Sequence, residues 1–532
     1  MPAQASSALP TRVIDVNAGE DGSIVRLVSS TGCRGPYIIL SHVWGRTKTL
    51  TTTLATLKER SDEMAVESLP KTFQDAVSIA RQLSIRYLWI DSLCIIQDSA
   101  SDWSTESAKM GEYYMNSHFT VAAVSSSDGS GGCFVKRDML KVTPCPVRIR
   151  LPKSDGCVGW TGVTHAFFRL RFGNDPSDRT DGFQRPPLWQ RGWVVQERLL
   201  STRLLQFSDV QMSWRCRSEW GSERIPEGSS WYIKGSKEDA ILRPVLLGLK
   251  EIIPYSTEGN KDDQTEIGSV VKAAIGTAGE SNNDLYDAWY DLVMLYGKCD
   301  LTISADVFPA ISGIVKSISR ASRDKYVAGL WKGDLHRGLL WTAPDSTSSR
   351  RDIRQYRAPS WSWASLPAIC SFYVRQILMS EPDTRYMRIE QADVLIEGEN
   401  PFGVVSSGKL KIWGLLKRAH PYDAECHGEK VFDDIREAQR SKETLFDLAE
   451  RRGVGQYYPD NLDRKYLSEV WCSPIMTEVR RAGGGEEKQV QARCLALMRF
   501  SEGSDVYMRV GSAWIMDFAW FRDCQFVSYD VV

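Results

Sequence analysis

The sequence lacks the features of several large protein classes. Its 532 residues contain no apolar run near the roughly 20 residues that a membrane-spanning helix needs. The N-terminal stretch MPAQASSALPTRVIDV has neither the cationic start nor the apolar core of a secretory signal. We therefore expect a cytoplasmic protein without a membrane span.

An excess of charge of one sign is also missing. Lys and Arg number 66 against 67 Asp and Glu, with no basic run, so nucleic acid is not expected as a partner. The 12 cysteines are scattered without a C-x-x-C pair, which favours reduced thiols in an intracellular protein. The six histidines have no ligand spacing, so we expect neither a metal site nor a bound cofactor.

What is present is the composition of a globular protein, with 42% apolar residues and 18 tryptophans. The length exceeds what one compact core usually supports and predicts two or three domains. We expect a loose lead-in over 1–34 with one strand near Ile24–Val28, an α/β domain over 35–215, a helical, tryptophan-rich middle over 216–390 and a β-rich region over 391–532. A charged helix over Asp433–Arg452 is expected to interrupt the last region.

The α/β domain is predicted from alternating strand and helix patterns. Short apolar runs at Tyr37–Leu40, Tyr87–Ile90 and Phe119–Val124 indicate buried strands. The helices between them are expected to start at two N-caps, Thr72 and Asp102. This alternation predicts a parallel sheet with helices on both faces.

Within the first helix, Asp75 stands three residues after Thr72, as in a capping box. The second helix carries Glu106 on an otherwise apolar face. Residues 136–187 look irregular. Leu188–Arg198 is predicted to be one continuous helix, followed by a hairpin.

Polar side chains follow the predicted strands, at the sheet edge where open α/β proteins bind ligands. The candidates after the first strand are Ser41, His42 and Trp44, and those after the second are Asp91, Cys94, Gln97 and Asp98. Trp103 and Glu106 follow on the helix, and Arg191, Gln196 and Glu197 come from the later helix. Glu106, His42 and Asp91 are the catalytic candidates, and the others are candidates for substrate binding. Each also has a structural interpretation, as a helix cap, a packed side chain or a member of a salt bridge.

Five ordered blocks resemble one known family, the fungal heterokaryon-incompatibility (HET) domain. They are LSHVWG (Leu40–Gly45), LPKTFQDAV (Leu69–Val77), YLWIDSLCIIQD (Tyr87–Asp98), DWSTESAKMGEYY (Asp102–Tyr114) and RGWVVQERLLSTRLLQF (Arg191–Phe207). Further on, YVAGLW, GLLW and RAPSWSWAS are similar to the C-terminal part of large HET proteins.

The resemblance implies a fungal, cytosolic protein of non-self recognition and programmed cell death. It also implies a TIR-like, flavodoxin-like fold, because HET domains have been compared with TIR domains. Some TIR domains cleave the nicotinamide glycosidic bond of NAD with one helical glutamate, which by motif position is Glu106. NAD is then a substrate, and Asp91 and Arg191 are expected to orient its ribose and a phosphate.

Two alternatives remain open. The family block usually reads S-Y-C-W-G, whereas this chain has His42 and Val43 in the middle positions. A histidine at a strand end favours a HET-like scaffold adapted to acid/base chemistry on a small molecule of fungal secondary metabolism. The other alternative is a non-enzymatic scaffold that signals by self-association, in which Glu106 and Arg191 form structural salt bridges.

Overall fold

The computed structural model describes most of the chain. The described residues are 7–19, 21–45, 49–137, 145–152, 160–168, 186–216, 219–223, 226, 283–343, 356–366, 370–372, 385–421, 443–447, 452–460, 467, 469–481 and 488–532. They divide into two compact units, Met1–Arg243 and Pro244–Val532, which are described separately below.

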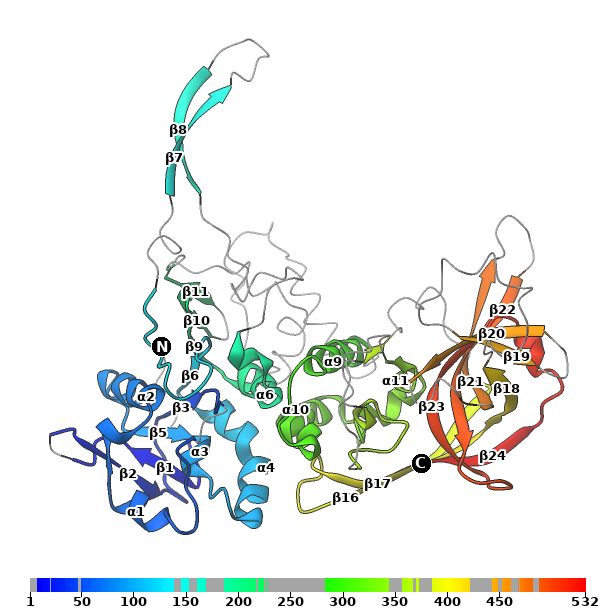
Figure 1. The fold of residues 1–532 in the computed structure, drawn as a ribbon, viewed down its shortest axis with the longest axis horizontal. Helices are drawn as coiled ribbons and strands as arrows, with labels where there is room; N and C mark the ends of the chain where they lie inside the picture. The colour runs from blue at the N-terminus through cyan, green and yellow to red at the C-terminus, as the bar shows by residue number, and fades with distance from the viewer. Residues whose placement is uncertain are drawn as a thin grey trace, which may run out of the picture. The chain divides into compact units, whose positions relative to one another are not determined.

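The first unit is built on a nine-stranded sheet with the order β11-β10-β9-β6-β3-β5-β1-β2-β4 (Figure 1). Its centre consists of four neighbouring parallel strands, β9 (Leu204–Phe207), β6 (Phe119–Ala123), β3 (Tyr37–Ser41) and β5 (Tyr87–Ile90). Counted along the chain from β3, they follow the order 2-1-3-4 across the sheet. Every residue of β3 and β6 is buried, as expected for strands covered on both faces.

The predicted parallel sheet is present at the centre and is wrong at both edges, where the sheet is antiparallel. At one of these edges the antiparallel pairing begins with the predicted hairpin. The edge strands are β10 (Met212–Arg215) and β11 (Trp220–Ser222) on one side, and β1 (Arg12–Asp15), β2 (Ile24–Ser29) and β4 (Met64–Ala65) on the other. Short connections join β1 to β2, β9 to β10 and β10 to β11, which antiparallel neighbours allow, whereas parallel neighbours need a crossover. The stretch expected to be a loose lead-in thus contributes two strands to the sheet, including the predicted strand near Ile24–Val28.

Helices cover both faces of this sheet. Helix α2 (Lys71–Gln82) packs against β3 and β5, while α4 (Ala100–Asn116) and α6 (Gly192–Leu200) pack against each other on the opposite face (Figure 1). Trp89 of β5 meets the rings of Tyr113 and Tyr114 of α4, with centroids 5.7 and 6.1 Å away. The shorter helices are α1 (Leu57–Asp62) and α3 (Asp91–Cys94).

The predicted helix caps are wrong. Helix α2 begins at Lys71 after Pro70, with no side-chain cap. Thr72 Oγ1 instead accepts a hydrogen bond from the Gly132 amide (3.1 Å), and Asp75 Oδ2 accepts one from the Cys133 amide (2.8 Å). Both residues therefore anchor the glycine-rich loop after β6, because that loop offers buried N–H groups that need acceptors.

Helix α4 begins at Ala100 and is capped by Ser99, whose hydroxyl accepts from the Asp102 amide. Asp102 lies in the first turn, where its carboxylate is free to pair with Arg12 of β1. A carboxylate in the first turn also interacts favourably with the helix dipole.

The predicted single helix over Leu188–Arg198 is interrupted. A 3₁₀ helix, η2 (Pro187–Gln190), is followed by Arg191 in an extended conformation (φ −84°, ψ 132°), and α6 starts at Gly192. The region expected to be irregular also contains an antiparallel pair, β7 (Cys145–Pro152) and β8 (Trp160–Phe168).

The second unit begins with helices and tryptophans. Helix α9 (Asn283–Tyr296) and helix α10 (Ser312–Ser322) belong to the middle region that was expected to be helical. Short 3₁₀ turns over Ser304–Val307 and Pro309–Ile311 precede α10. The indole N–H groups of Trp289 and Trp363 both donate to the Gly329 carbonyl, at 3.1 and 2.8 Å. The smaller elements are β12 (Tyr326–Val327), β13 (Leu330–Trp331), α11 (Leu335–Gly338), β14 (Trp341–Thr342) and β15 (Ser371–Phe372).

The β-rich C-terminal region is confirmed as a second nine-stranded sheet, ordered β16-β17-β24-β23-β20-β19-β18-β21-β22. Because β22 also pairs with β23, six of these strands close on themselves around an apolar core. The strands are β16 (Met387–Ile396), β17 (Val405–Leu415), β18 (Lys417–Pro421), β19 (Glu443–Asp447), β20 (Arg452–Pro459), β21 (Val470–Arg481), β22 (Lys488–Arg499), β23 (Val506–Ile515) and β24 (Phe526–Val531).

The prediction of a charged helix over Asp433–Arg452 is wrong for those of its residues that the structure describes. Glu443–Asp447 is strand β19 and Arg452 opens β20, while 433–442 and 448–451 lie outside the described residues. Pairing between β19 and β20 overrides the helical preference of the charged residues.

A buried ion pair joins this sheet to the tryptophan-rich segment. Arg509 is fully buried, and its guanidinium donates to both carboxylate oxygens of Asp460, at 3.1 and 3.2 Å. It also donates to the carbonyls of Leu339 and Trp341 at 2.5 Å and lies 3.5 Å from the centroid of the Trp341 ring. Among the described helices of the chain, none is both long enough and apolar enough to cross a membrane.

Candidate active site

The end of β3 brings polar side chains to the carboxyl edge of the parallel strands. After Ser41 the chain leaves the sheet and turns at Gly45, which has φ +77°. A Cβ at Gly45 would lie 2.4 Å from Cβ of Asp128, so glycine permits both the left-handed turn and the close approach to the loop after β6. The same edge holds Asp91, because β5 runs parallel to β3 and ends one residue earlier.

Asp91 is held in place by N–H donors. Trp44 Nε1 donates to Oδ2 (2.9 Å), and the Ser92 amide donates to Oδ1 (2.7 Å). His42 Nδ1 lies 3.7 Å from Oδ1, so the proximity that the sequence suggested for His42 and Asp91 is present. The Asp91 side chain remains 18% exposed, which leaves its carboxylate accessible from outside.

The imidazole of His42 is buried, and few polar contacts fix its position. Its ring meets Phe73 of α2 edge-on at 5.0 Å, and within the described residues neither ring nitrogen has a partner in hydrogen-bonding geometry. Burial lowers the pKa of His42 to about 4; Asp91 opposes this shift and Arg191 adds to it. The ring is therefore neutral at pH 7.

Glu197 of α6 is the second carboxyl group of this edge. It is 4% exposed, and burial raises its pKa to about 7. Arg191 and the hydroxyl groups of Ser41 and Tyr114 favour the charged form, while Asp91 disfavours it. Glu197 therefore titrates near neutral pH, as an acid/base group must.

Arg191 reaches this cluster because it lies outside the helix. Its extended conformation directs the guanidinium to the carbonyl oxygen of His42, to which Nη1 donates a hydrogen bond. The break between η2 and α6 thus follows from a contact with the end of β3. We call His42, Asp91, Tyr114, Arg191 and Glu197, together with Ser41 and Trp44, the carboxyl-edge cluster.

Tyr114 is the member that sequence reasoning missed. It was expected only as part of the apolar face of α4, and it is indeed 1% exposed. Burial and the nearby Glu197 and Asp91 carboxylates raise its pKa well above the usual value. The hydroxyl of a buried tyrosine usually requires a partner, and this was the available signal.

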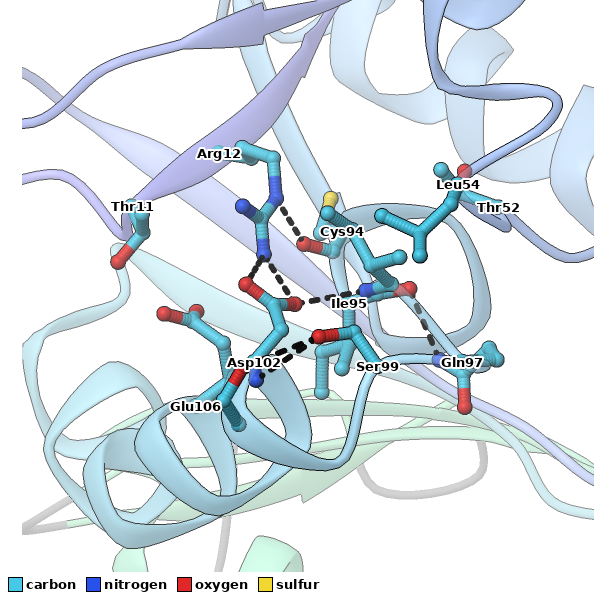
Figure 2. Close-up of polar contacts among 12 residues, drawn as sticks. Thr11, Arg12, Thr52, Leu54, Cys94, Ile95, Gln97, Ser99, Asp102 and Glu106 are labelled. Atoms are coloured by element: carbon cyan, nitrogen blue, oxygen red, sulfur yellow. Dashed lines mark hydrogen bonds and ion pairs between the residues drawn. The ribbon is translucent and has the colours of Figure 1, made fainter.

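Four other candidates lie in the segment that leaves β5 or on the later helix, and the hydrogen bonds of the first three involve backbone groups. Burial raises the pKa of the Cys94 thiol to about 12, so it stays protonated, and the Cys94 carbonyl accepts from Arg12 Nε (2.8 Å) (Figure 2). Gln97 Nε2 donates to the Asp91 carbonyl (3.1 Å). Asp98 Oδ1 accepts from the Leu54 amide (2.8 Å). Gln196 is fully buried on α6.

Glu106 lies apart from the carboxyl-edge cluster. Figure 2 shows its side chain in the second turn of α4, directed toward Thr11 of the segment before β1. Oε2 accepts from the Tyr113 hydroxyl (2.9 Å) and Oε1 is 4.0 Å from Lys109 Nζ. Within the described part of the chain, no hydrogen bond or ion pair joins Glu106 to Asp91 or Glu197. Trp103, one turn earlier, meets the Trp193 ring of α6 edge-on at 6.3 Å.

Beside Glu106, an ion pair missed by the sequence analysis fixes the start of α4. Arg12 donates to both carboxylate oxygens of Asp102, at 2.7 and 2.5 Å, and Asp102 Oδ2 also accepts from the Ile96 amide (2.8 Å) (Figure 2). No group of three or more His, Cys, Asp or Glu residues in the described ranges is arranged to hold a metal ion.

No curated protein and no solved structure matches the chain. A family model does match, that of the heterokaryon incompatibility protein (HET), over residues 37–197. The matched segment opens with the first residue of β3 and closes on Glu197, so it contains the whole carboxyl-edge cluster. Residues 37–197 of this chain therefore match the heterokaryon-incompatibility (HET) domain family.

Proposed function

We propose that this protein acts in non-self recognition and programmed cell death of the heterokaryon-incompatibility type, and that its HET domain cleaves the nicotinamide glycosidic bond of NAD. The match over 37–197 supports the first part. The observation that carries the enzymatic part is the carboxyl-edge cluster, in which two carboxyl groups, an arginine and a neutral histidine share one buried edge.

The topology supports this location for a nucleotide. The order 2-1-3-4 of the parallel strands agrees with the start of the flavodoxin-like order, which favours a TIR-like class for the first unit. In such sheets ligands bind outside the carboxyl ends, where neighbouring connections leave for opposite faces. Here β3 leads to α2, and its neighbour β6 leads to α6 on the other face.

The chemistry needs a carboxylate near the ribose. Breaking the bond between C1′ and the nicotinamide nitrogen builds positive charge on the sugar, and the electron pair leaves with the neutral base. A carboxylate fixed beforehand stabilises that charge without reorganising during the reaction. Asp91 fits this role because two N–H donors hold it and 18% of its side chain is exposed.

The test is nicotinamide release from NAD by the full chain. We expect Asp91→Asn to lower turnover by about two orders of magnitude or more. Asp98→Asn is the matched control, since Asp98 lies in the same exit segment and accepts only from the Leu54 amide among described residues. An inactive wild type, or equal activity of both variants, would refute the proposal. Loss in Glu106→Gln with full activity in Asp91→Asn would move the catalytic carboxylate to α4.

A second candidate is acid/base chemistry on a small molecule of secondary metabolism. It is favoured by His42, a buried imidazole beside Asp91 at a position where the family usually has tyrosine. Among the described residues, neither ring nitrogen of His42 has a hydrogen-bond partner. The two candidates differ in a fungal expression host, because a cell-death effector arrests growth and Asp91→Asn relieves the arrest. A biosynthetic enzyme leaves growth unchanged, and a self-associating scaffold remains toxic in Asp91→Asn and Glu106→Gln.

A further inference from the structure

We propose that Arg12 is a positioning residue for Asp91, because it holds the turn that carries the Asp91 carboxylate at the carboxyl edge of the sheet. Arg12 opens β1 and lies before the segment that the family model matches. This role rests on the proposed NAD cleavage with Asp91 as its carboxylate. It extends the catalytic unit to a strand that the family motifs leave out.

The direction of β1 brings Arg12 to the end of β5. The two strands pair antiparallel, with Ile14 opposite Leu88. The same register, continued along β1, places Arg12 level with Ile90, the last residue of β5. Arg12 is therefore beside the point where the chain leaves the sheet, and Figure 2 shows its guanidinium directed into the turns that follow.

Arg12 and Asp102 hold the backbone on both sides of Ile95. Arg12 Nε donates to the Cys94 carbonyl (2.8 Å), and Asp102 Oδ2 accepts from the Ile96 amide (2.8 Å). Arg12 Nη2 joins the two side chains by donating to both Asp102 oxygens, and these side chains are only 14% and 17% exposed. Hydrogen bonds between charged groups are roughly twice as strong as neutral ones. We call this pair the exit clamp.

The turn held by the exit clamp begins at Asp91. Asp91 is the first residue of α3 and Cys94 is the last, and the Ile95 amide donates to the Asp91 carbonyl (3.1 Å). A single helical turn has few hydrogen bonds of its own, so its position depends on the groups that hold its ends. Moving α3 by about 1 Å away from Trp44 would lengthen the hydrogen bond from Trp44 Nε1 to Asp91 beyond its normal range. A misplacement of this size lowers enzymatic rates by as much as about 100-fold.

A second ion pair of β1 supplies a matched control. Arg86 donates to both carboxylate oxygens of Asp15, at 3.1 and 2.8 Å, and so ties the same strand to the start of β5 rather than to its end. Lysine keeps the charge of arginine but has one nitrogen in place of the planar fork, so it cannot serve two partners in the geometry of Arg12. Arg12→Lys and Arg86→Lys therefore make the same change at opposite ends of β5.

The experiment measures kcat and KM for NAD cleavage by the full chain. We expect Arg12→Lys to lower kcat by about 10- to 100-fold with little change in KM, because a misplaced Asp91 stabilises the charge that develops only in the transition state less well. Arg86→Lys should keep the wild-type kcat. Hydrogen exchange of a peptide over 91–98 should become faster in Arg12→Lys and stay unchanged in Arg86→Lys.

A double variant separates positioning from a general loss of folded protein. If Arg12 acts through the Asp91 carboxylate, Arg12→Lys should lower kcat much less in the Asp91→Asn background than in the wild type. A merely structural effect would reduce the amount of folded protein by a similar factor in both backgrounds.

Each outcome decides between the proposals. Equal kcat values for Arg12→Lys and Arg86→Lys, or the same fold-loss in both backgrounds, would overturn the role of Arg12 while NAD cleavage stands. No turnover by the wild type would overturn both. If Arg12→Lys does not fold, as judged by circular dichroism, Asp102→Asn removes the charge of the exit clamp from its other side and is measured in its place, with the same expected results.

Discussion

The buried carboxyl group of Glu197 predicts an unusual dependence of stability on pH. Its pKa rises from 4.5 to about 7 in the folded protein. Between these values the unfolded chain releases the proton while the folded protein keeps it, so the free energy of unfolding falls as pH rises. One pKa unit corresponds to about 1.4 kcal/mol, which gives a loss of about 3 kcal/mol by the time pH passes 7.

His42 has the opposite effect over nearly the same range. Its pKa falls from 6.5 to about 4, so below 6.5 the unfolded chain takes up a proton that the folded protein refuses. Stability from this group is complete above pH 6.5 and is lost as pH falls toward 4, again by about 3 kcal/mol. In the wild type the two contributions therefore largely cancel between these limits.

Glu197→Gln should remove one contribution and expose the other. Relative to the wild type, we expect the variant to gain about 3 kcal/mol in the free energy of unfolding between about pH 5 and pH 8. Urea unfolding of the full chain, followed by hydrogen exchange of peptides from β3 and α6, separates this unit from the rest of the chain. His42→Asn should show the reverse trend.

The refuting result is a constant difference. If wild type and Glu197→Gln differ by the same free energy at both ends of this pH range, Glu197 does not titrate differently in the folded and unfolded chain. The environment assigned to the carboxyl-edge cluster would then be incorrect.

Two further predictions concern backbone and core. Asp460→Ala removes the carboxylate that faces the buried Arg509 guanidinium, so the free energy of unfolding should fall by about 3–5 kcal/mol. Urea unfolding with hydrogen exchange of β23 peptides measures this loss. A loss below about 1 kcal/mol would contradict the burial of this pair. Gly45→Ala places a Cβ 2.4 Å from Cβ of Asp128 at a residue with φ +77°. We therefore expect about 1–3 kcal/mol of destabilisation and slower NAD turnover. An unchanged urea midpoint for β3 peptides would contradict this prediction.

The centre of the first sheet was predictable because it depends on local pattern. The runs at Tyr37–Leu40, Tyr87–Ile90 and Phe119–Val124 are apolar throughout, as strands buried on both faces must be, and helices separate them. Placing polar residues after these strands then located His42 and Asp91 at one edge. On one flank the hairpin of β9 and β10 was predicted, because a short turn joins its two strands. On the other flank the pairing of β1 with β5 was not predictable, since nothing local to β1 states which strand it will pair with.

The rest of the site depends on contacts between distant residues. The apolar spacing around Arg191 conceals a break in the helix, because its extended conformation is tied to a carbonyl 149 residues earlier. In the sequence, Tyr114 looks like any tyrosine on an apolar helix face. Only its neighbour Glu197, on another helix, distinguishes it from a core residue. Thr72 and Asp102 are residue types that often cap helices. Their side chains instead contact Gly132 and Arg12, which are remote in sequence.

The limits of the family match have a consequence for engineering a fragment of this protein. The segment 37–197 leaves out β1 and β9, which pair with the two outer strands of the matched part, β5 and β6. A fragment cut at those limits would present two bare strand edges, which recruit other chains and aggregate. A fragment that keeps the strands of the first sheet paired therefore has to run from Arg12 to Ser222, a span wider than the matched segment.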